Sequence, residues 1–365
     1  MLYCCVRRII VMFVIFFMSL CLFLLPGCTN RIQKCRMQSA PVVAIPIINE
    51  AQKIENDTKK IQARIGRLNP ATIVPGRTIS ENSVSLIQDL ATYYKVNIAP
   101  EDIPSWNKYN VCKPVAERFK QFMKAMQSDR DIIWAIRGGY GTRDLIPLLD
   151  SMPVPNYGKT LVGFSDITSL HLFMAKKWPR WRAIHASVLI HATEHAHIGN
   201  KFNTLLDILE GKIDKYVIDS LYPLNACAKT TSPVIGRLTG GNLSVVRDSL
   251  GKIWEMQSAG RIVFLEDVNL PMEGIESALI YLKENCKFDG VKAVVFGRFT
   301  IPDYPQKEIV DRLQEFANSL EIPVYFTHKF GHSNINQPLI YNAVATIYRD
   351  KITIDATSYF DEDYP

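Results

Sequence analysis

Residues 131–141 read DIIWAIRGGYG, and residues 160–168 read TLVGFSDIT. Each stretch begins as a short apolar strand and continues into a polar turn. Helices are predicted around them, over Pro114–Met126 before the first stretch and over Asp166–Trp178 after the second. Because strands and helices alternate, this part of the chain predicts a parallel, doubly wound α/β sheet.

The alternation continues toward both ends of the chain. Toward the N-terminus, a first strand is expected at Pro41–Ile47, followed by helices over Asn49–Arg64 and Glu81–Tyr94. Toward the C-terminus, a helix is expected at Phe202–Leu209. The remaining predicted strands are Arg261–Leu265, Val291–Phe296, Val324–Phe326, Ala343–Tyr348 and Ile352–Ile354, and the remaining predicted helices are Glu273–Lys287 and Gln306–Ser319.

The length of 365 residues predicts about two domains at roughly 150 residues each. We expect residues 1–38 to be a targeting segment with its linker, and residues 39–200 to be an N-terminal α/β domain with a mostly parallel sheet flanked by helices. Residues 201–233 are expected to form a bridge, and residues 234–365 a second, smaller α/β domain with a mixed sheet. Apolar residues make up 47% and charged residues 21% of the chain, which is typical of globular proteins and excludes a disordered or fibrous one.

The positive net charge is concentrated at the N-terminus. The whole chain carries +6, but residues 1–38 contain five basic side chains and no acidic one. The rest holds 37 basic and 36 acidic side chains, a balance of +1. We therefore expect no nucleic-acid partner.

The N-terminal segment has the pattern of an export signal. Arg7 and Arg8 precede an apolar run, Ile9–Leu25, which ends in Pro26-Gly27-Cys28. The end of this run resembles the lipobox of bacterial lipoproteins, in which the cysteine carries the lipid. An uncleaved membrane anchor and soluble export are the alternatives. All three place the folded part outside the cytoplasm, on the periplasmic or cell-envelope side, and the first two attach it to the membrane.

The cysteines do not predict a metal or redox motif. A cleaved lipoprotein signal would remove three of the eight cysteines and lipidate Cys28. The four that remain are widely spaced and form no C-x-x-C pair. One or two disulfides among them stay open in an oxidising compartment. These four are Cys35, Cys112, Cys227 and Cys286.

Three residues with catalytic potential follow predicted strands. Ser165 lies on a sharp strand-to-helix turn, where helix N–H groups can stabilise an oxyanion, although a serine here is also a common N-cap. Glu266 follows one strand directly, and His332 lies just past another. Because ligands of α/β sheets bind beyond the carboxyl ends of the strands, we expect these three side chains to meet. Their chemistry fits a Ser-His-Glu triad.

A metal site is the rival interpretation. Residues 191–195 read HATEH, which fits the inverted zincin pattern H-x-x-E-H, with His197 close by. On a helix, His191 and His195 would share a face and could bind zinc, with Glu194 as the base. A five-residue match in a histidine-rich region is weak, however, and we expect no metal.

The motifs together resemble the LD-carboxypeptidase family of serine peptidases, whose second branch contains the microcin C immunity peptidases. Five blocks match in the family's order over roughly residues 115 to 345. The blocks are Arg137–Gly141 with Arg143, Gly163–Thr168 at the nucleophile, Gly236–Leu243, Leu265–Asp267 at the triad acid, and Phe330–His332 at the triad histidine.

The resemblance implies the reaction and the roles of the residues. It implies a two-domain serine peptidase, without metal or cofactor, with Ser165 in the N-terminal domain and Glu266 and His332 in the C-terminal one. The family's best-known activity releases the terminal D-alanine from peptidoglycan tetrapeptides, so the expected partner is a small muropeptide. Members often form homodimers, and a homodimer is possible here as well.

The glycine-rich loop completes the predicted site. In family terms, the backbone N–H groups of Gly138, Gly139 and Asp166 form the oxyanion hole. Glycines have no side chain, so the backbone can approach the tetrahedral centre closely. Arg137 is a candidate for binding the terminal carboxylate of the substrate, with a loop-holding salt bridge as its alternative role. Tyr140 is the second candidate for substrate binding.

Four segments depart from the family pattern and keep two other functions open. They include Ser333 after the histidine and His185-Ala186-Ser187, where the family often has His-Gly-Pro. The triad frame is unaffected by these changes, but the substrate pocket differs. One alternative is a lipoprotein that binds cell-wall peptides without turnover. The other is an immunity-type amide hydrolase of peptide–nucleotide antibiotics.

Overall fold

The computed structural model describes residues 44–73, 114–193, 197–229 and 232–360. Contacts divide the chain into two compact units, Met1–Ile47 and Ile48–Pro365. The expected targeting segment over residues 1–38, Cys28 and the expected helix over Glu81–Tyr94 lie outside the described residues. Apart from the start of one helix, the described residues belong to the second unit.

The expected first strand at Pro41–Ile47 is wrong from Ala44 onward. Helix α2 spans Ala44–Leu68 and takes in the residues expected as the end of that strand. A proline in the first turn of a helix breaks no hydrogen bond, because the first N–H groups have no partner within the helix, and Pro46 lies there. The first strand observed is instead β1, Ala71–Ile73, which is buried throughout.

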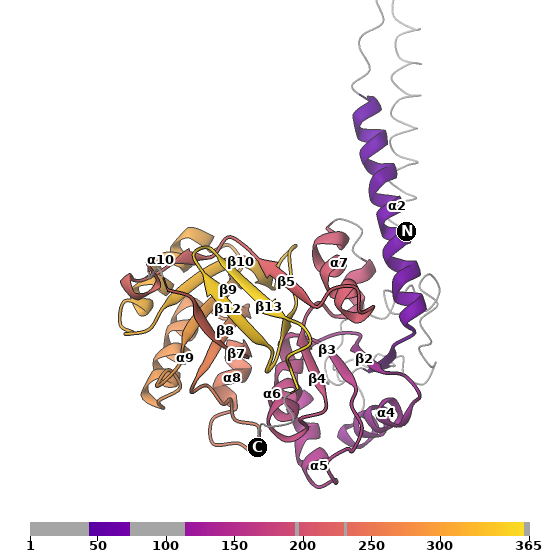
Figure 1. Cartoon of the computed structure of the whole chain (residues 1–365), viewed down its shortest axis with the longest axis horizontal. Helices are drawn as coiled ribbons and strands as arrows, with labels where there is room; N and C mark the ends of the chain where they lie inside the picture. Colours follow the sequence, from indigo (N-terminus) through magenta and orange to yellow (C-terminus); the bar gives the residue numbers. More distant parts are fainter. Residues whose placement is uncertain (1–43, 74–113, 194–196, 230–231, 361–365) are drawn as a thin grey trace, which may run out of the picture. The chain divides into compact units, whose positions relative to one another are not determined.

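The first sheet has five strands in the order β1-β2-β3-β4-β11 (Figure 1). The four strands β1 to β4 are parallel, and β11 joins antiparallel to β4. The expected mostly parallel sheet is therefore confirmed. Its remaining strands are β2 (Ile132–Ala135), β3 (Thr160–Gly163), β4 (Arg182–His185) and β11 (Leu339–Ile340).

The helices between these strands follow the predicted alternation. Pro114 caps α4, as its fixed backbone angle allows, and the buried face of α4 includes Phe122 and Met126. After β3, a 3₁₀ turn at Ser165–Ile167 leads into α6, which is buried over Thr168–Met174 and exposed at its last two residues. The helices and turns of this region are α4 (Val115–Gln127), η2 (Thr142–Leu145), α5 (Ile146–Asp150), α6 (Thr168–Lys177), η4 (Leu189–Thr193) and α7 (Ile198–Leu209).

The second sheet has eight strands in the order β5-β13-β12-β7-β8-β9-β10-β6. Its centre, β7 to β10, is parallel, and antiparallel strands complete both edges, which confirms the expected mixed sheet (Figure 1). The strands are β5 (Lys215–Ile218), β6 (Tyr222–Pro223), β7 (Val234–Asn242), β8 (Arg261–Val268), β9 (Ala293–Thr300), β10 (Val324–Gly331), β12 (Val344–Tyr348) and β13 (Lys351–Asp355).

Three helices connect the parallel strands of this sheet. They are α8 (Leu243–Asp248), α9 (Met272–Glu284) and α10 (Gln306–Ala317), and each carries the chain from one strand to the next. Parallel strands need such crossovers. Strands β8 and β9 are buried along most of their length, as expected for a sheet covered on both faces. Polar side chains that could contact a ligand are therefore expected toward the ends of these strands.

Candidate active site

Ser165 lies at the strained turn between β3 and α6. Its φ is +62°, in the left-handed region that side-chain-bearing residues rarely adopt. Neither the 3₁₀ turn nor α6 has a side-chain N-cap hydrogen bond, so Ser165 does not serve as the cap that its sequence position also allows. A strained, half-buried serine after a parallel strand has the local geometry of a nucleophile elbow.

Gly138 packs directly against this serine. A Cβ atom at Gly138 would lie 3.2 Å from Ser165 Cβ and 3.5 Å from Ser165 Oγ. The backbone of the glycine-rich loop therefore reaches the hydroxyl only because this position has no side chain. The structure thus brings Gly138 and Ser165 together, as the sequence predicts.

Two buried charged residues hold the glycine-rich loop in place. Asp166 accepts hydrogen bonds from the Thr142 N–H at 2.9 Å and from the Thr142 hydroxyl. Burial raises the pKa of Asp166, and the hydrogen bonds from Thr142 oppose this shift. On the other side, Arg118 donates to the Gly141 carbonyl at 3.0 Å and contacts Asp144 at 3.1 Å. The residue after the nucleophile is therefore tied to the loop expected to form the oxyanion hole.

Glu266 and His332 form a short charge-assisted pair. His332 Nδ1 lies 2.6 Å from Glu266 Oε2. Glu266 is fully buried in β8, whereas the His332 side chain keeps about a fifth of its surface exposed. The other ring nitrogen of His332 is therefore available for a proton transfer, while the carboxylate fixes the ring.

Burial and pairing shift the pKa values of Glu266 and His332 in opposite directions, and the combined effect of pairing is larger. Burial alone would raise the pKa of Glu266, but the charge and hydrogen bond of His332 lower it below its usual range. Burial alone would lower the pKa of His332, but the charge and hydrogen bond of Glu266 raise it. Each partner thus favours the charged form of the other.

The backbone around His332 is shaped to reach Glu266. Gly331 has φ +111°, and a Cβ atom there would lie 2.8 Å from the Arg298 carbonyl oxygen and 3.2 Å from Glu266 Cβ. The Gly331 N–H donates to Asn336 Oδ1 at 3.1 Å. The Thr300 hydroxyl donates to the His332 carbonyl at 3.0 Å. Only glycine fits before this histidine.

The nucleophile and the pair come from different sheets and meet through aromatic and polar contacts. The ring of Phe164, which precedes Ser165, lies 4.5 Å from the ring of His332. The Asn242 N–H at the end of β7 donates to the Thr168 hydroxyl at 3.1 Å. Glu266 is opposite Asn242 in the register of β7 and β8. The turn that carries Ser165 therefore lies next to the His332 ring and next to β7, the strand that pairs with β8.

The other predicted site residues border this region. Arg137 follows β2 and is half-buried, and Gly139 next to it is exposed with φ +136°. Tyr140 is 44% exposed, and its hydroxyl accepts a hydrogen bond from Arg143. Arg143 also contacts Asp248 at 2.6 Å. The exposed ring of Tyr140 is thus held by a polar chain that reaches α8.

His185 is a residue of this site to which the sequence analysis gave no role. It ends β4, is fully buried, and its Nε2 lies 3.9 Å from Glu266 Oε1. Its ring packs edge-on against Phe164 at 5.8 Å and Phe264 at 5.4 Å. Its position at a strand end could have indicated a role in the site. The four-residue strand Arg182–His185 was not predicted, so this position could not be recognised.

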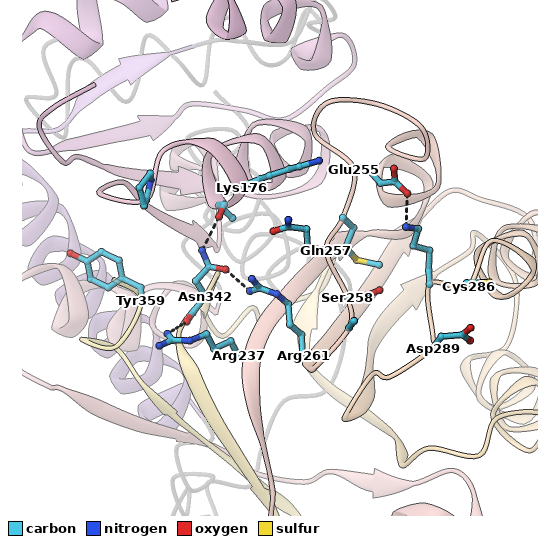
Figure 2. Close-up of a pocket in the computed structure, with 15 residues that line it drawn as sticks. Lys176, Arg237, Glu255, Gln257, Ser258, Arg261, Cys286, Asp289, Asn342 and Tyr359 are labelled. Carbon is cyan, nitrogen blue, oxygen red and sulfur yellow. Dashed lines mark hydrogen bonds and ion pairs between the residues drawn. The ribbon is translucent and has the colours of Figure 1, made fainter. Parts of the chain in front are cut away.

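A large cavity lies at the opposite ends of β7 and β8. It has a volume of about 990 Å³ and is lined by Arg237 near the start of β7 and by Arg261 at the start of β8. Figure 2 shows both arginines directed at Asn342, to whose carbonyl and amide oxygens they donate at 2.7 and 2.5 Å. Because parallel strands carry the triad candidates at their carboxyl ends, this cavity is separate from the candidate active site.

The metal and cysteine predictions fall partly outside the described residues. His191 is half-buried in a 3₁₀ helix, and Glu194 and His195 are not described. Within the described ranges, no group of three or more His, Cys, Asp or Glu side chains is arranged to hold a metal ion. Cys227 and Cys286 are exposed free thiols, and Cys35 and Cys112 are not described. None of the helices among the described residues is both long enough and apolar enough to span a bilayer.

Comparison with known proteins identifies the family. The family model described as the LD-carboxypeptidase N-terminal domain matches residues 65–186, and that of the LD-carboxypeptidase C-terminal domain matches residues 235–347. A protein of Rickettsia conorii named "Putative carboxypeptidase" is 41% identical over 235 residues, which cover 64% of this chain and 73% of that protein. The murein tetrapeptide carboxypeptidase of Pseudomonas aeruginosa is 29% identical over 241 residues, covering 61% of this chain and 74% of that protein.

The fold agrees with these matches. The solved structure of the microcin C7 self immunity protein MccF aligns with a TM-score of 0.65 and 18% identity, covering 80% of this chain and 96% of that one. This likeness confirms the expected arrangement of one mostly parallel and one mixed sheet. With both domain models matched in order, the chain belongs to the LD-carboxypeptidase family of peptidases.

Proposed function

We propose that this protein is a serine peptidase that releases the terminal D-alanine from peptidoglycan tetrapeptides. One observation carries the proposal: a buried carboxylate, Glu266, holds the His332 ring at 2.6 Å beside the strained turn that presents Ser165. The murein tetrapeptide carboxypeptidase among the relatives supports the choice of substrate.

The residues divide the reaction between them. Ser165 Oγ attacks the carbonyl of the L-centre that precedes D-alanine, while His332 takes the serine proton. His332 then donates that proton to the leaving D-alanine amine, and an acyl-enzyme is left on Ser165. Water attacks the acyl-enzyme with His332 as base and releases the shortened peptide. Glu266 keeps the ring oriented and stabilises its cation throughout.

The glycine-rich loop is proposed to stabilise the oxyanion. The backbone N–H groups of Gly138, Gly139 and Asp166 would donate to the negative oxygen of the tetrahedral intermediate. Losing one such donor costs about 3–4 kcal/mol of transition-state stabilisation in comparable sites. Arg137 would bind the terminal carboxylate, with the exposed ring of Tyr140 next to it.

The proposal includes a location that the sequence alone supports. The apolar run before Cys28 suggests a lipid-anchored protein on the periplasmic side of the membrane, where peptidoglycan peptides are found. Metabolic labelling with a fatty-acid analogue should place lipid on wild-type protein and none on Cys28→Ala. Equal labelling of both proteins would rule out this anchor.

Mass spectrometry of muropeptides tests the proposed reaction. Full-length protein is incubated with tetrapeptides, and wild type is expected to remove one alanyl residue, whereas Ser165→Ala removes none. Turnover by Ser165→Ala would contradict the nucleophile. Binding without turnover by wild type would favour a peptide-binding lipoprotein, and cleavage of a peptide–nucleotide amide alone would favour the immunity-type hydrolase.

A further inference from the structure

One oxygen of the buried Glu266 carboxylate is unused by His332. His332 Nδ1 contacts Oε2, whereas Oε1 accepts no hydrogen bond of normal length from any described residue. A buried carboxylate oxygen without a donor is unfavourable, because burial removes the water that would otherwise solvate it. The structure therefore calls for a donor near Oε1.

The Asn242 amide, which also lowers the pKa of Glu266, donates to Asp267 Oδ1 at 3.1 Å. A second candidate for that donor is His185. Its Nε2 lies 3.9 Å from Oε1, just beyond hydrogen-bond length, and it too has no hydrogen-bond partner among the described residues. Burial lowers the pKa of His185 to about 4, so the ring is neutral at neutral pH and carries one N–H. A small shift of the His185 ring toward Glu266 would give Nε2 and Oε1 a hydrogen bond and leave the contact of Oε2 with His332 in place.

We propose that His185 is a positioning residue of the site, which donates its Nε2–H to Glu266 Oε1. The carboxylate is then held between two imidazoles, one on each oxygen. Because His185 ends β4, next to the strand that leads to Ser165, this contact also ties the acid of the second sheet to the sheet that carries the nucleophile. The inference rests on the proposed function and assigns His185 no contact with substrate.

The donor should control the protonation of His332. When His332 is neutral, the buried pair of Glu266 and His332 has a net negative charge, and the second hydrogen bond stabilises that charge. When His332 is protonated, the two charges compensate and the donor matters less. Removal of the donor therefore favours the protonated state and raises the pKa of His332 by about half to one unit.

Other ionisable groups face His185, Glu266 and His332, and they are the same in the wild type and in any variant of His185. Asp267 raises the pKa of His332 after the larger effects of burial and Glu266, and His191 faces His332 from the 3₁₀ helix. His171 on α6 faces His185, and Tyr341 faces Glu266. A matched pair of substitutions at His185 isolates its contribution from theirs.

Ring-nitrogen NMR titration of full-length, ¹⁵N-histidine-labelled protein tests the proposal. Three proteins are compared: wild type, His185→Leu, which fills the space without a donor, and His185→Gln, whose amide restores one. The pKa of His332 should rise by about half to one unit in His185→Leu and stay at the wild-type value in His185→Gln. The signal of His332 is assigned by its loss in His332→Ala.

Two results would overturn the inference. One is an unchanged His332 pKa in His185→Leu, and the other is an equal shift in the Leu and Gln variants, which would indicate packing alone. If His185→Leu does not fold, His185→Met replaces it as the variant without a donor. The titration needs no substrate, so a wild-type protein without peptidase activity would count against the proposed function and leave this test intact.

Discussion

The Asn242 N–H donates a 3.1 Å hydrogen bond to the hydroxyl of Thr168 and so joins the end of β7 to the start of α6. Asn242 ends a strand of the second sheet, and α6 follows β3 of the first sheet. The contact is close, because a Cβ atom at the neighbouring Gly241 would lie 2.5 Å from Thr168 Cγ2. The hydrogen bond holds the turn that carries Ser165 against β7, the strand that pairs with the Glu266 strand β8.

Thr168→Val is expected to weaken both folding and turnover. Valine keeps the shape but removes the acceptor, which leaves the buried Asn242 N–H without a partner at a cost of about 1–3 kcal/mol. Thr168→Ser keeps the acceptor and serves as the control. Urea unfolding and muropeptide turnover are measured for both. Equal behaviour of the two variants would show that the hydrogen bond does not connect the sheets.

Gly331→Ala is expected to disrupt the pair of Glu266 and His332. An L side chain at φ +111° is strained by about 1–2 kcal/mol, and the added Cβ would also meet the Arg298 carbonyl at 2.8 Å. Gly211→Ala is the matched control, since Gly211 has φ +66° but open space around it. Both variants should lose stability in urea unfolding, and only Gly331→Ala should lose turnover. Full activity of Gly331→Ala would contradict the assigned geometry.

Glu266→Gln is expected to lower kcat by about 10³–10⁴-fold with little change in fold. The amide fills the same space but removes the charge that stabilises protonated His332 and holds its tautomer. Glu276→Gln, on the surface beside Arg312, is the control. Steady-state kinetics and circular dichroism check the outcome. A kcat within tenfold of wild type would exclude Glu266 as the triad acid.

Stability is expected to fall as the pH drops below about 6.5. Burial lowers the pKa of His185 to about 4 and that of His191 to about 3. The unfolded chain therefore binds protons on these rings at a pH where the folded chain does not. Each ring costs up to about 2 kcal/mol of folding free energy near pH 5. His332 acts in the opposite direction, because its pKa is raised.

Urea unfolding near pH 7.5 and near pH 5 measures this loss. His191→Gln should be less acid-sensitive than wild type, because it cannot take up the proton on unfolding. His197→Gln is the control, as His197 is exposed. Equal or greater stability of the wild type at the lower pH would contradict the neutral state of these histidines in the folded protein.

The sequence predicts those features that depend on local patterns. Apolar runs that end in Gly or polar residues located β2, β3 and β8, and with them the strand ends that carry Ser165 and Glu266. Pro114, at the start of a helical pattern, located α4 nearly to the residue. Strand ends of parallel sheets lie together, so the sequence also predicts that the triad candidates lie close to one another, and the structure pairs two of them, Glu266 and His332.

Other features depend on contacts between residues far apart in the chain. Strand β11 has two residues and is a strand only because it pairs with β4, far earlier in the sequence. The role proposed for His185 depends on the same region, since Arg182–His185 is too short and too polar at its start to stand out. At Pro41–Ile47 an apolar run was expected to form a strand, but its described part begins a helix, in whose first turn a proline is tolerated.

The central claim is that Ser165 is a nucleophile activated by His332. Labelling with a fluorophosphonate, followed by peptide mass mapping, tests it without knowledge of the natural substrate. We predict that the reagent modifies Ser165 in the wild type and that the labelling rate falls at least about a hundredfold in His332→Ala. Modification at another residue, or an unchanged rate in His332→Ala, would contradict the account.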